Sequence, residues 1–167
     1  MQTNFIVRSL ELSDLEALLE LYGHLHAHDD PLPPSSEVER IWSRILRDPG
    51  QVYYGAFVDG ILVSACNATI IANLTRGARP YAVIENVVTN ARFRRRGIGS
   101  AVLRQLLDRC WEHRCYKIML MSSVSRSEIH GFYESMGFNK HAKQAFVITA
   151  GFRPMTMRLE LDSEEGR

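Results

Sequence analysis

The chain has 167 residues, of which 46% are hydrophobic and 23% are charged, and its 20 Lys and Arg residues nearly balance its 19 Asp and Glu residues. Such a length and composition are typical of one globular domain that buries its core without disulfides or metal, so we expect a single domain over residues 1–167. A net charge of +1 gives no global attraction to nucleic acid or to an anionic membrane. We therefore expect neither partner, and any anion site must be local.

The cysteines and the N-terminus bear on the cellular compartment in which the protein is expected. Cys66, Cys110 and Cys115 are an odd number without a Cys-x-x-Cys pair, which indicates free thiols in a reducing environment. The N-terminus has no basic start before a long apolar run, and no apolar stretch approaches the roughly 20 residues that span a bilayer. We expect a cytoplasmic protein.

The first third of the chain has the pattern of one strand followed by two helices. Residues 4–8 are short and apolar, which favours a strand. Ser13 with Glu16, and Ser36 with Glu39, have the spacing of capping boxes before apolar residues at helical spacing. Each helix should end near the next glycine.

The middle of the chain is dominated by runs of β-branched and aromatic residues. These runs predict strands at residues 52–58, 61–71, 81–89 and 116–121. Asp59-Gly60 is a two-residue hairpin signal between the first two. Apolar residues at helical spacing predict a helix at residues 100–113, so the strands on either side of it should pair in parallel.

The last third is expected to contain one helix and two strands. The helix covers residues 127–136, and Gly137 is its expected C′ residue. A strand should begin within residues 138–148, and alternating apolar residues predict a last strand at 155–161.

The strand at residues 81–89 leads through a basic loop and two glycines into a helix. Glycines at such a junction let successive N–H groups converge on one anion at the positive end of the helix, which predicts a phosphate cradle. A P-loop would need a Lys-Ser/Thr pair after Gly99, where Ser100 begins the helix instead. A dinucleotide fingerprint would need a third glycine, where this chain has Val102.

The remaining pattern, Arg94-x-x-Gly97-x-Gly99 after a strand, resembles the main signature of the GNAT superfamily of N-acetyltransferases. A second signature of that superfamily, Phe-Tyr-x-x-x-Gly-Phe, is matched at residues 132–138. The resemblance implies an α/β (α+β) acyl-CoA N-acyltransferase fold: a mixed, mostly antiparallel central sheet with a splayed parallel pair and helices on both faces. It implies transfer of an acetyl group from acetyl-coenzyme A to a primary amine by direct attack in a ternary complex, without a metal.

The resemblance also assigns residues to the cofactor. The pyrophosphate is expected on the backbone amides of Arg95, Arg96, Gly97, Ile98, Gly99 and Ser100. Charge would come from one or more of Arg92, Arg94, Arg95 and Arg96, although these could equally form a solvated surface run. Pantetheine is expected on the main chain of Val87, Val88 and Thr89, with a backbone N–H near Val88 for the developing oxyanion; these residues could also be packed sheet residues only.

Two side chains are the catalytic candidates. Glu85 is the expected general base, acting through water, and the alternative is a salt bridge to a neighbouring arginine. Tyr133 is the expected acid for the departing thiolate, because a phenol with a pKa near 10 suits a thiol near 8.5; the alternative is an ordinary core tyrosine. Arg126 stands where the superfamily often has Asn, so either Arg126 meets a phosphate or one of the nearby serines substitutes.

The acceptor site is expected beside the connection between the first two helices. This connection contains His24, His26, His28, Asp29 and Asp30. A metal site is an alternative, but no third ligand follows at an established spacing and the prolines favour a loop. We expect Asp29 or Asp30 to meet a cationic acceptor. Asn86, beside Glu85, is a further acceptor-binding candidate.

Residues 84–99 and 115–118 are also similar to the glucosamine-6-phosphate N-acetyltransferases. We therefore expect a small-molecule amine as acceptor. An amino sugar, a protein or peptide amine, and a non-catalytic module that only binds acetyl-coenzyme A remain open, as does a homodimer.

Overall fold

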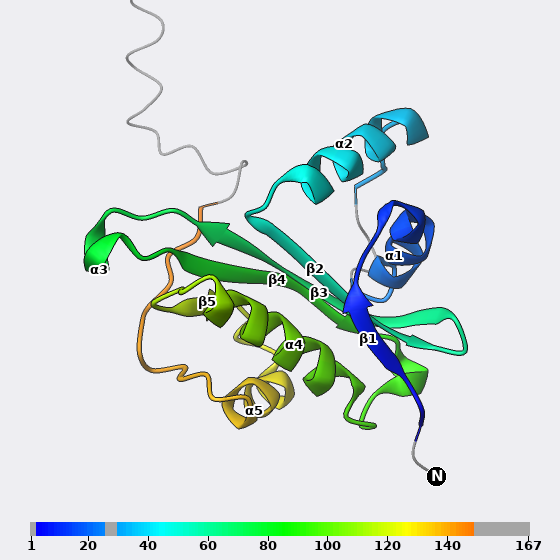
Figure 1. Ribbon diagram of the computed structural model, residues 1–167. Coiled ribbons are helices and arrows are strands. Elements are labelled where there is room, and N and C mark those ends of the chain that lie inside the picture. The colour runs from blue at the N-terminus through cyan, green and yellow to red at the C-terminus, as the bar shows by residue number, and fades with distance from the viewer. Residues whose placement is uncertain (1–2, 26–29, 149–167) are drawn as a thin grey trace, which may run out of the picture.

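The computed structural model describes residues 3–25 and 30–148. Its centre is one sheet in the order β1-β2-β3-β4-β5, formed by Ile6–Ser9, Gln51–Val58, Ile61–Ile71, Tyr81–Thr89 and Ile118–Leu120. Neighbours are antiparallel from β1 to β4, and β5 pairs with β4 in parallel (Figure 1). The predicted mixed, mostly antiparallel sheet is confirmed.

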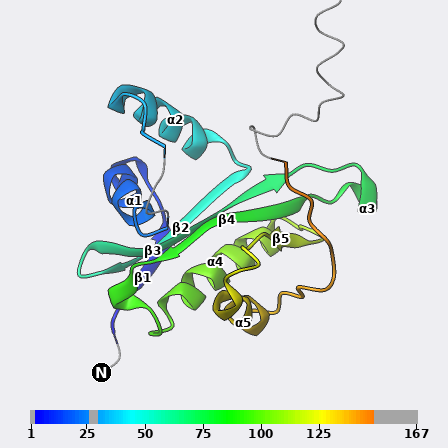
Figure 2. The ribbon, with the colours of Figure 1, turned by 180° about the vertical axis from the view of Figure 1, so that it is seen from behind.

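Helices lie on both faces of this sheet, as predicted. They are α1 (Leu15–Tyr22), α2 (Ser35–Arg47), α3 (Thr75–Ala78), α4 (Ile98–Glu112) and α5 (Ser127–Ser135), with short 3-10 helices at Leu12–Asp14 and Ala91–Phe93. Figures 1 and 2 show α1 and α2 on one face and α4 and α5 on the other. Within the described ranges, no helix is long and apolar enough to cross a membrane. The cytoplasmic location stays a prediction.

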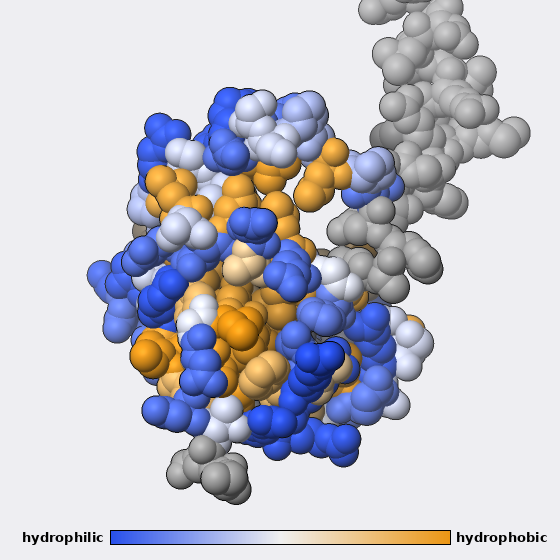
Figure 3. Space-filling model, turned by 90° about the vertical axis from the view of Figure 1, so that its right-hand side faces the viewer, coloured by the Kyte–Doolittle hydropathy of each residue, from blue (hydrophilic) through white to orange (hydrophobic). Residues whose placement is uncertain are grey.

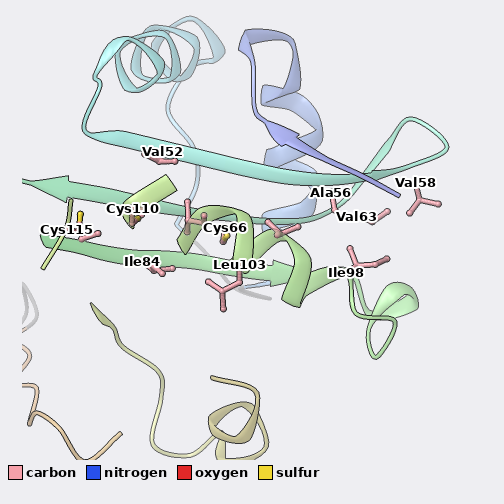
Figure 4. Packing of buried hydrophobic residues seen from close by; sticks show 14 residues of the cluster. Val52, Ala56, Val58, Val63, Cys66, Ile84, Ile98, Leu103, Cys110 and Cys115 are labelled. Carbon is pink, nitrogen blue, oxygen red and sulfur yellow. The ribbon is translucent and has the colours of Figure 1, made fainter. Parts of the chain in front are cut away.

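Alternating side chains of the strands build a separate apolar cluster on each face. On the α4 face, Ile84 of β4 packs with Ile98 and Leu103 of α4 (Figure 4). On the other face, Val88 belongs to the cluster that includes Leu18 and Leu21 of α1. Because β4 contributes to both clusters, its backbone is held from two sides, which gives the candidate site a rigid base.

The three cysteines are free and buried, as predicted. Cys66, Cys110 and Cys115 lie in the apolar cluster on the α4 face (Figure 4). Burial raises the pKa of Cys110 to about 12 and also raises that of Cys66. These thiols stay protonated and act as small apolar side chains.

The hairpin between β2 and β3 is confirmed at Asp59-Gly60. Both residues have positive φ, 49° and 79°, which a two-residue turn of the right twist requires. Near this hairpin, Ile6 of the edge strand β1 and Ile61 at the start of β3 are 69% and 63% exposed. The view from that side shows apolar surface among polar residues (Figure 3). The homodimer stays a prediction.

Both predicted capping boxes are wrong. Ser13 lies inside the 3-10 helix that precedes α1, and the reciprocal capping bonds form between Glu11 and Asp14 instead. The helix α2 begins directly after Pro34, which has no side-chain acceptor, so Ser36 falls within the helix. The apolar periodicity located both helices correctly, but it did not fix their first residues.

Asp14 is buried and anchors the start of α1 to the edge strand β1. Its carboxylate accepts hydrogen bonds from Arg8 Nη1 at 2.7 Å, from Arg8 Nη2 at 2.8 Å and from the Glu11 backbone N–H. The bonds from Arg8 are the main reason that the pKa of Asp14 lies below its usual value. The pair stays ionised at neutral pH and fixes α1 against the sheet.

The strand predicted within residues 138–148 is also wrong. Gly137 follows α5 with a φ of 94°, as its predicted C′ role requires. The chain then turns, and Asn139 accepts hydrogen bonds from the backbone N–H groups of His141 and Ala142. The apolar residues 145–148 pair with no strand of the described chain, and Phe146 is 92% exposed. The strand predicted at residues 155–161 lies outside the described residues.

Candidate active site

The parallel strands β4 and β5 part from each other at Glu85. Their pairing runs from Ala82 opposite Ile118 to Ile84 opposite Leu120 and then stops, although β4 continues to Thr89. Beyond Ile84, the backbone groups of β4 that face away from β3 therefore have no strand partner in the described chain. The predicted splayed pair is confirmed (Figure 2).

A β-bulge lies at the point where the two strands part. The register with β3 changes from Ala65 opposite Val88 to Asn67 opposite Glu85, and Asn86 has a φ of 53°. Asparagine tolerates this left-handed conformation better than most residues. The bulge changes the direction of β4 between Glu85 and Val88. The candidate base, Glu85, therefore lies on one side of the bulge, and the candidate oxyanion-binding N–H near Val88 lies on the other.

The half-buried side chain of Asn86 is held by hydrogen bonds to neighbouring elements. Its Nδ2 donates to Asn67 Oδ1 at 3.0 Å, and it is also hydrogen-bonded to the Tyr22 hydroxyl on α1. Burial is the main reason that the pKa of Tyr22 is raised. Asn86 thus connects α1 with the bulge, and its assignment to acceptor binding stays a prediction.

Glu85 is exposed and is the first residue beyond the paired part of β4. It alternates with the buried Ile84, whose side chain belongs to the α4 face, so the carboxylate projects from the face covered by α1. None of the ion pairs among the described residues includes Glu85. The salt-bridge alternative has no partner in that part of the chain, and the carboxylate is accessible for proton transfer.

Tyr133 lies on α5 and is half-buried. Its ring packs against Phe132 and Phe138 at centroid distances of 5.2 and 6.0 Å. Burial raises the pKa of Tyr133, and the proximity of Cys66 and of the Glu85 carboxylate raises it further. The phenol therefore keeps its proton at neutral pH and lies near enough to Glu85 for the two groups to interact.

The start of α4 is the place where the cradle was predicted. Gly97 is the N-cap residue with a φ of 77°, and no side chain caps this helix end. The first amides of a helix have no intrahelical partner, so those of Ile98, Gly99 and Ser100 are available to an anion. A Cβ at Gly97 would meet open space. The main chain is thus exposed at the helix end, which fits a pyrophosphate group.

Gly99 lies against the end of β4. A Cβ at this position would come within 2.9 Å of Thr89 Oγ1. This glycine is therefore required by a close approach between the helix start and the strand end, and its φ is not positive. The approach brings the helix start next to Thr89, the last of the residues on which pantetheine was predicted.

The four arginines before the cradle are exposed, and none takes part in an ion pair of the described chain. Arg96 Nη1 donates to Thr3 Oγ1 at 3.3 Å and lies over the Phe93 ring. Arg94 Nε donates to the Thr89 carbonyl at 3.0 Å. Arg92 and Arg95 also leave their charge at the surface, so a phosphate beside the cradle would meet a positive potential.

Arg126 is exposed and is the N-cap residue of α5. It follows the serine-rich loop after β5, in which Ser123 Oγ and Ser125 Oγ are 2.8 Å apart. The Ser123 carbonyl lies 3.0 Å from His130 Nε2 of α5. Arg126 thus follows β5, and β4 lies across the gap between the two parted strands. The contact of Arg126 with a phosphate stays a prediction.

The predicted acceptor loop is only partly described. Asp29, with His26 and His28, lies outside the described residues, and Asp30 is exposed. His24 Nε2 lies 3.2 Å from Asn90 Nδ2, so the end of α1 approaches the end of β4. In the part of the chain that the structure describes, no group of three or more His, Cys, Asp or Glu residues could hold a metal ion.

Two buried polar residues of β3, not expected from the sequence, also bear on this site. Ser64 and Asn67 are 2% and 5% exposed, and each bonds to β4. A polar side chain in a buried strand is costly unless it has a partner, so their position in an apolar run was the available signal. Their partners could not be named without the register of the sheet.

Known proteins share this architecture. A model of the acetyltransferase (GNAT) family matches residues 15–138. The glucosamine 6-phosphate N-acetyltransferase of Trypanosoma brucei brucei is 34% identical over 141 residues, which cover 83% of this chain and 91% of that protein.

Two crystal structures of acetyltransferases are similar to this chain in fold and in sequence. A crystal structure of a Trypanosoma brucei acetyltransferase has a TM-score of 0.75 at 32% identity and covers 87% of this chain and 100% of its own. The glucosamine-6-phosphate N-acetyltransferase of Arabidopsis thaliana has a TM-score of 0.76 at 28% identity, with 87% and 98% covered. Since the family match spans more than half of the sequence and agrees with the parted strands and the cradle, the chain belongs to the acetyltransferase (GNAT) family and is an acetyl-coenzyme A-dependent N-acetyltransferase.

Proposed function

We propose that the protein transfers the acetyl group of acetyl-coenzyme A to a primary amine of a small molecule by direct attack in a ternary complex. The observation that carries this proposal is the parting of β4 and β5 immediately beside the uncapped start of α4. An extended chain can pair with the free backbone of β4 while its phosphates meet the helix amides. Acetyl-coenzyme A has both parts, and it supplies the activated acetyl group.

The side chains divide the proton transfers between them. Glu85, exposed at the parting of the strands, accepts a proton from the amine through water. Tyr133, whose raised pKa keeps it protonated, donates to the departing thiolate. A backbone N–H near Val88 polarises the thioester carbonyl. The amides of residues 95–100 hold the pyrophosphate, and Arg126 contributes charge from the opposite side.

An amino sugar is the acceptor class that we favour. The relative with 34% identity is a glucosamine 6-phosphate N-acetyltransferase. On the face from which Glu85 projects, the residues that follow Glu85 across the sheet are Asn67 and Tyr53, so no second charged residue lies beside the carboxylate in the register. Uncharged surroundings of this kind suit a hydroxyl-rich acceptor, with Asp30 or Asp29 close to its ammonium group.

A turnover assay with a panel of amines tests this function. Release of free thiol from acetyl-coenzyme A is measured with glucosamine 6-phosphate, unphosphorylated amino sugars, peptides with free N-termini and lysine-containing peptides. We expect the amino sugars to be turned over fastest. Fastest turnover of a peptide would instead support a protein-amine acetyltransferase, and cofactor binding without turnover of any amine would support a binding module.

Replacement of Tyr133 by Phe should slow the reaction by about tenfold to a hundredfold, because it removes the proton donor but keeps the ring. The raised pKa means that the wild-type phenol loses its proton only above about pH 10, so wild-type kcat should fall only above that pH. The variant should lack this fall. Profiles of kcat against pH for both proteins check the prediction, and an unchanged kcat in the variant would remove Tyr133 from the mechanism.

A further inference from the structure

The end of β4 is fixed by bonds to two different elements. Ser64 of β3 donates from Oγ to the Val88 carbonyl at 2.9 Å, and its Oγ is 2.8 Å from Thr89 Oγ1. Since the Ser64 proton is used on the Val88 carbonyl, the Thr89 hydroxyl donates to Ser64. Thr89 is thereby held in one orientation by a residue that is almost fully buried.

The carbonyl of Thr89 is held from the other side by Arg94. Arg94 Nε donates to this oxygen at 3.0 Å and closes the loop that contains the short helix Ala91–Phe93. The loop is also tied at its start, where the Asn90 N–H donates to the Val63 carbonyl at 2.9 Å. The loop of residues 90–94 is thus closed into a ring: its first residue bonds to β3, and the side chain of its last residue bonds to the end of β4.

This ring lies directly before the cradle. Arg95 and Gly97 have positive φ values of 59° and 77°, and the helix starts at once afterwards. Non-glycine residues pay a conformational cost for a positive φ, so the surrounding structure must hold Arg95 in place. Side-chain bonds flank that residue on both sides, from Arg94 to the Thr89 carbonyl and from Arg96 to Thr3. The bond from Arg94 is the one that joins the cradle to the strand on which pantetheine is proposed to lie.

We propose that Arg94 is a positioning residue that acts through its Nε–H on the Thr89 carbonyl, and that its positive charge is not what the cofactor site requires. The inference rests on the proposed acetyl-coenzyme A site. The bond orders residues 89–97, so that the amides at the start of α4 converge before the cofactor arrives. Arg95, which has a strained backbone and an exposed side chain, acts instead through its charge.

The identity of the donating atom makes this distinction testable. In glutamine, the amide nitrogen follows Cβ, Cγ and Cδ, so it stands at the same place along the side chain as arginine Nε. Lysine keeps the charge but places its nitrogen one methylene further out. Methionine has a similar length and no donor. Arg94→Gln therefore keeps the bond without the charge, and Arg94→Lys keeps the charge without the bond.

The experiment measures the Kd of acetyl-coenzyme A by calorimetry for wild type and the three variants, at physiological and at high salt. We expect Arg94→Met and Arg94→Lys to bind about fivefold to tenfold more weakly, as the loss of one hydrogen bond predicts. Arg94→Gln should stay within about threefold of wild type, and that difference should shrink at high salt, where charge is screened. At Arg95 we expect the opposite order: Arg95→Lys should keep nearly the wild-type Kd, and Arg95→Gln should bind acetyl-coenzyme A more weakly.

Thermal unfolding without cofactor separates this inference from the proposed function. We expect Tm to fall by about 2–4 °C in Arg94→Met and Arg94→Lys and to stay near the wild-type value in Arg94→Gln. If wild type did not bind acetyl-coenzyme A, the proposed function would fail while the order of Tm values still tested the bond. Wild-type behaviour of Arg94→Lys with a defect in Arg94→Gln, or equal behaviour of all three variants, overturns the inference.

Discussion

Gly97→Asp is expected to weaken acetyl-coenzyme A binding by at least about a hundredfold. Gly97 is the N-cap of α4, and a side chain there would extend into open space at the uncapped helix end. A carboxylate at that point competes for the free amides and repels the pyrophosphate at close range. Calorimetric titration of the purified variant with acetyl-coenzyme A measures the loss.

Two control variants separate the added charge from the added bulk and strain. Gly97→Asn has nearly the same shape without the charge, so it should bind only severalfold more weakly than wild type. Gly77→Asp adds the same charge at a φ of 72°, also in open space, but on the connection between β3 and β4. It should cost a similar 1 kcal/mol or so of stability and leave Kd unchanged. Equal weakening in Gly97→Asn and Gly97→Asp would contradict an anion site.

Glu85→Gln is expected to lower kcat by about a hundredfold while the Kd of acetyl-coenzyme A stays near its wild-type value. The amide keeps the size and polarity of the side chain but cannot take a proton from the amine, and general base catalysis typically contributes a factor of this order. Glu85 is exposed beyond the paired part of β4, so its loss removes no described ion pair. Steady-state kinetics with the fastest amine of the panel measure the effect.

A matched carboxylate away from the parted strands provides the control. Glu112 at the end of α4 is also exposed and forms a surface ion pair with Arg109. Glu112→Gln should leave kcat unchanged, since exposed pairs contribute little. If Glu85→Gln also kept wild-type kcat, the amine would have to lose its proton before it binds, and Glu85 would not be the base.

The sequence predicted the central sheet well because its signals are local. The strand predicted at residues 81–89 is β4 as observed, and the Asp59-Gly60 turn forms as expected. In both cases the required information lies within a few neighbouring residues: a run of β-branched side chains, or a dipeptide that accepts positive φ. The uncapped helix start at Gly97 was predictable for the same reason, since it depends on consecutive residues, and its role as a phosphate cradle stays a prediction.

Features that depend on contacts between distant segments were not predictable. The bond from Ser64 to the Val88 carbonyl needs the register of β3 against β4, and the shift in this register is itself caused by the bulge at Asn86. The capping pair of Glu11 and Asp14 is short-range, but Arg8 stabilises it from β1, which the apolar pattern does not reveal. The strand expected within residues 138–148 failed because period and propensity do not supply a partner.

Hydrogen exchange with and without acetyl-coenzyme A, followed by mass spectrometry, shows directly which backbone amides the cofactor covers. We expect slower exchange in the bound protein at two places, the unpaired part of β4 at residues 85–89 and the cradle at residues 95–101. The hairpin side of the sheet, at residues 56–63, should exchange at the same rate in both states. Protection absent from both predicted segments in a protein that binds the cofactor would contradict the site described for this acetyltransferase.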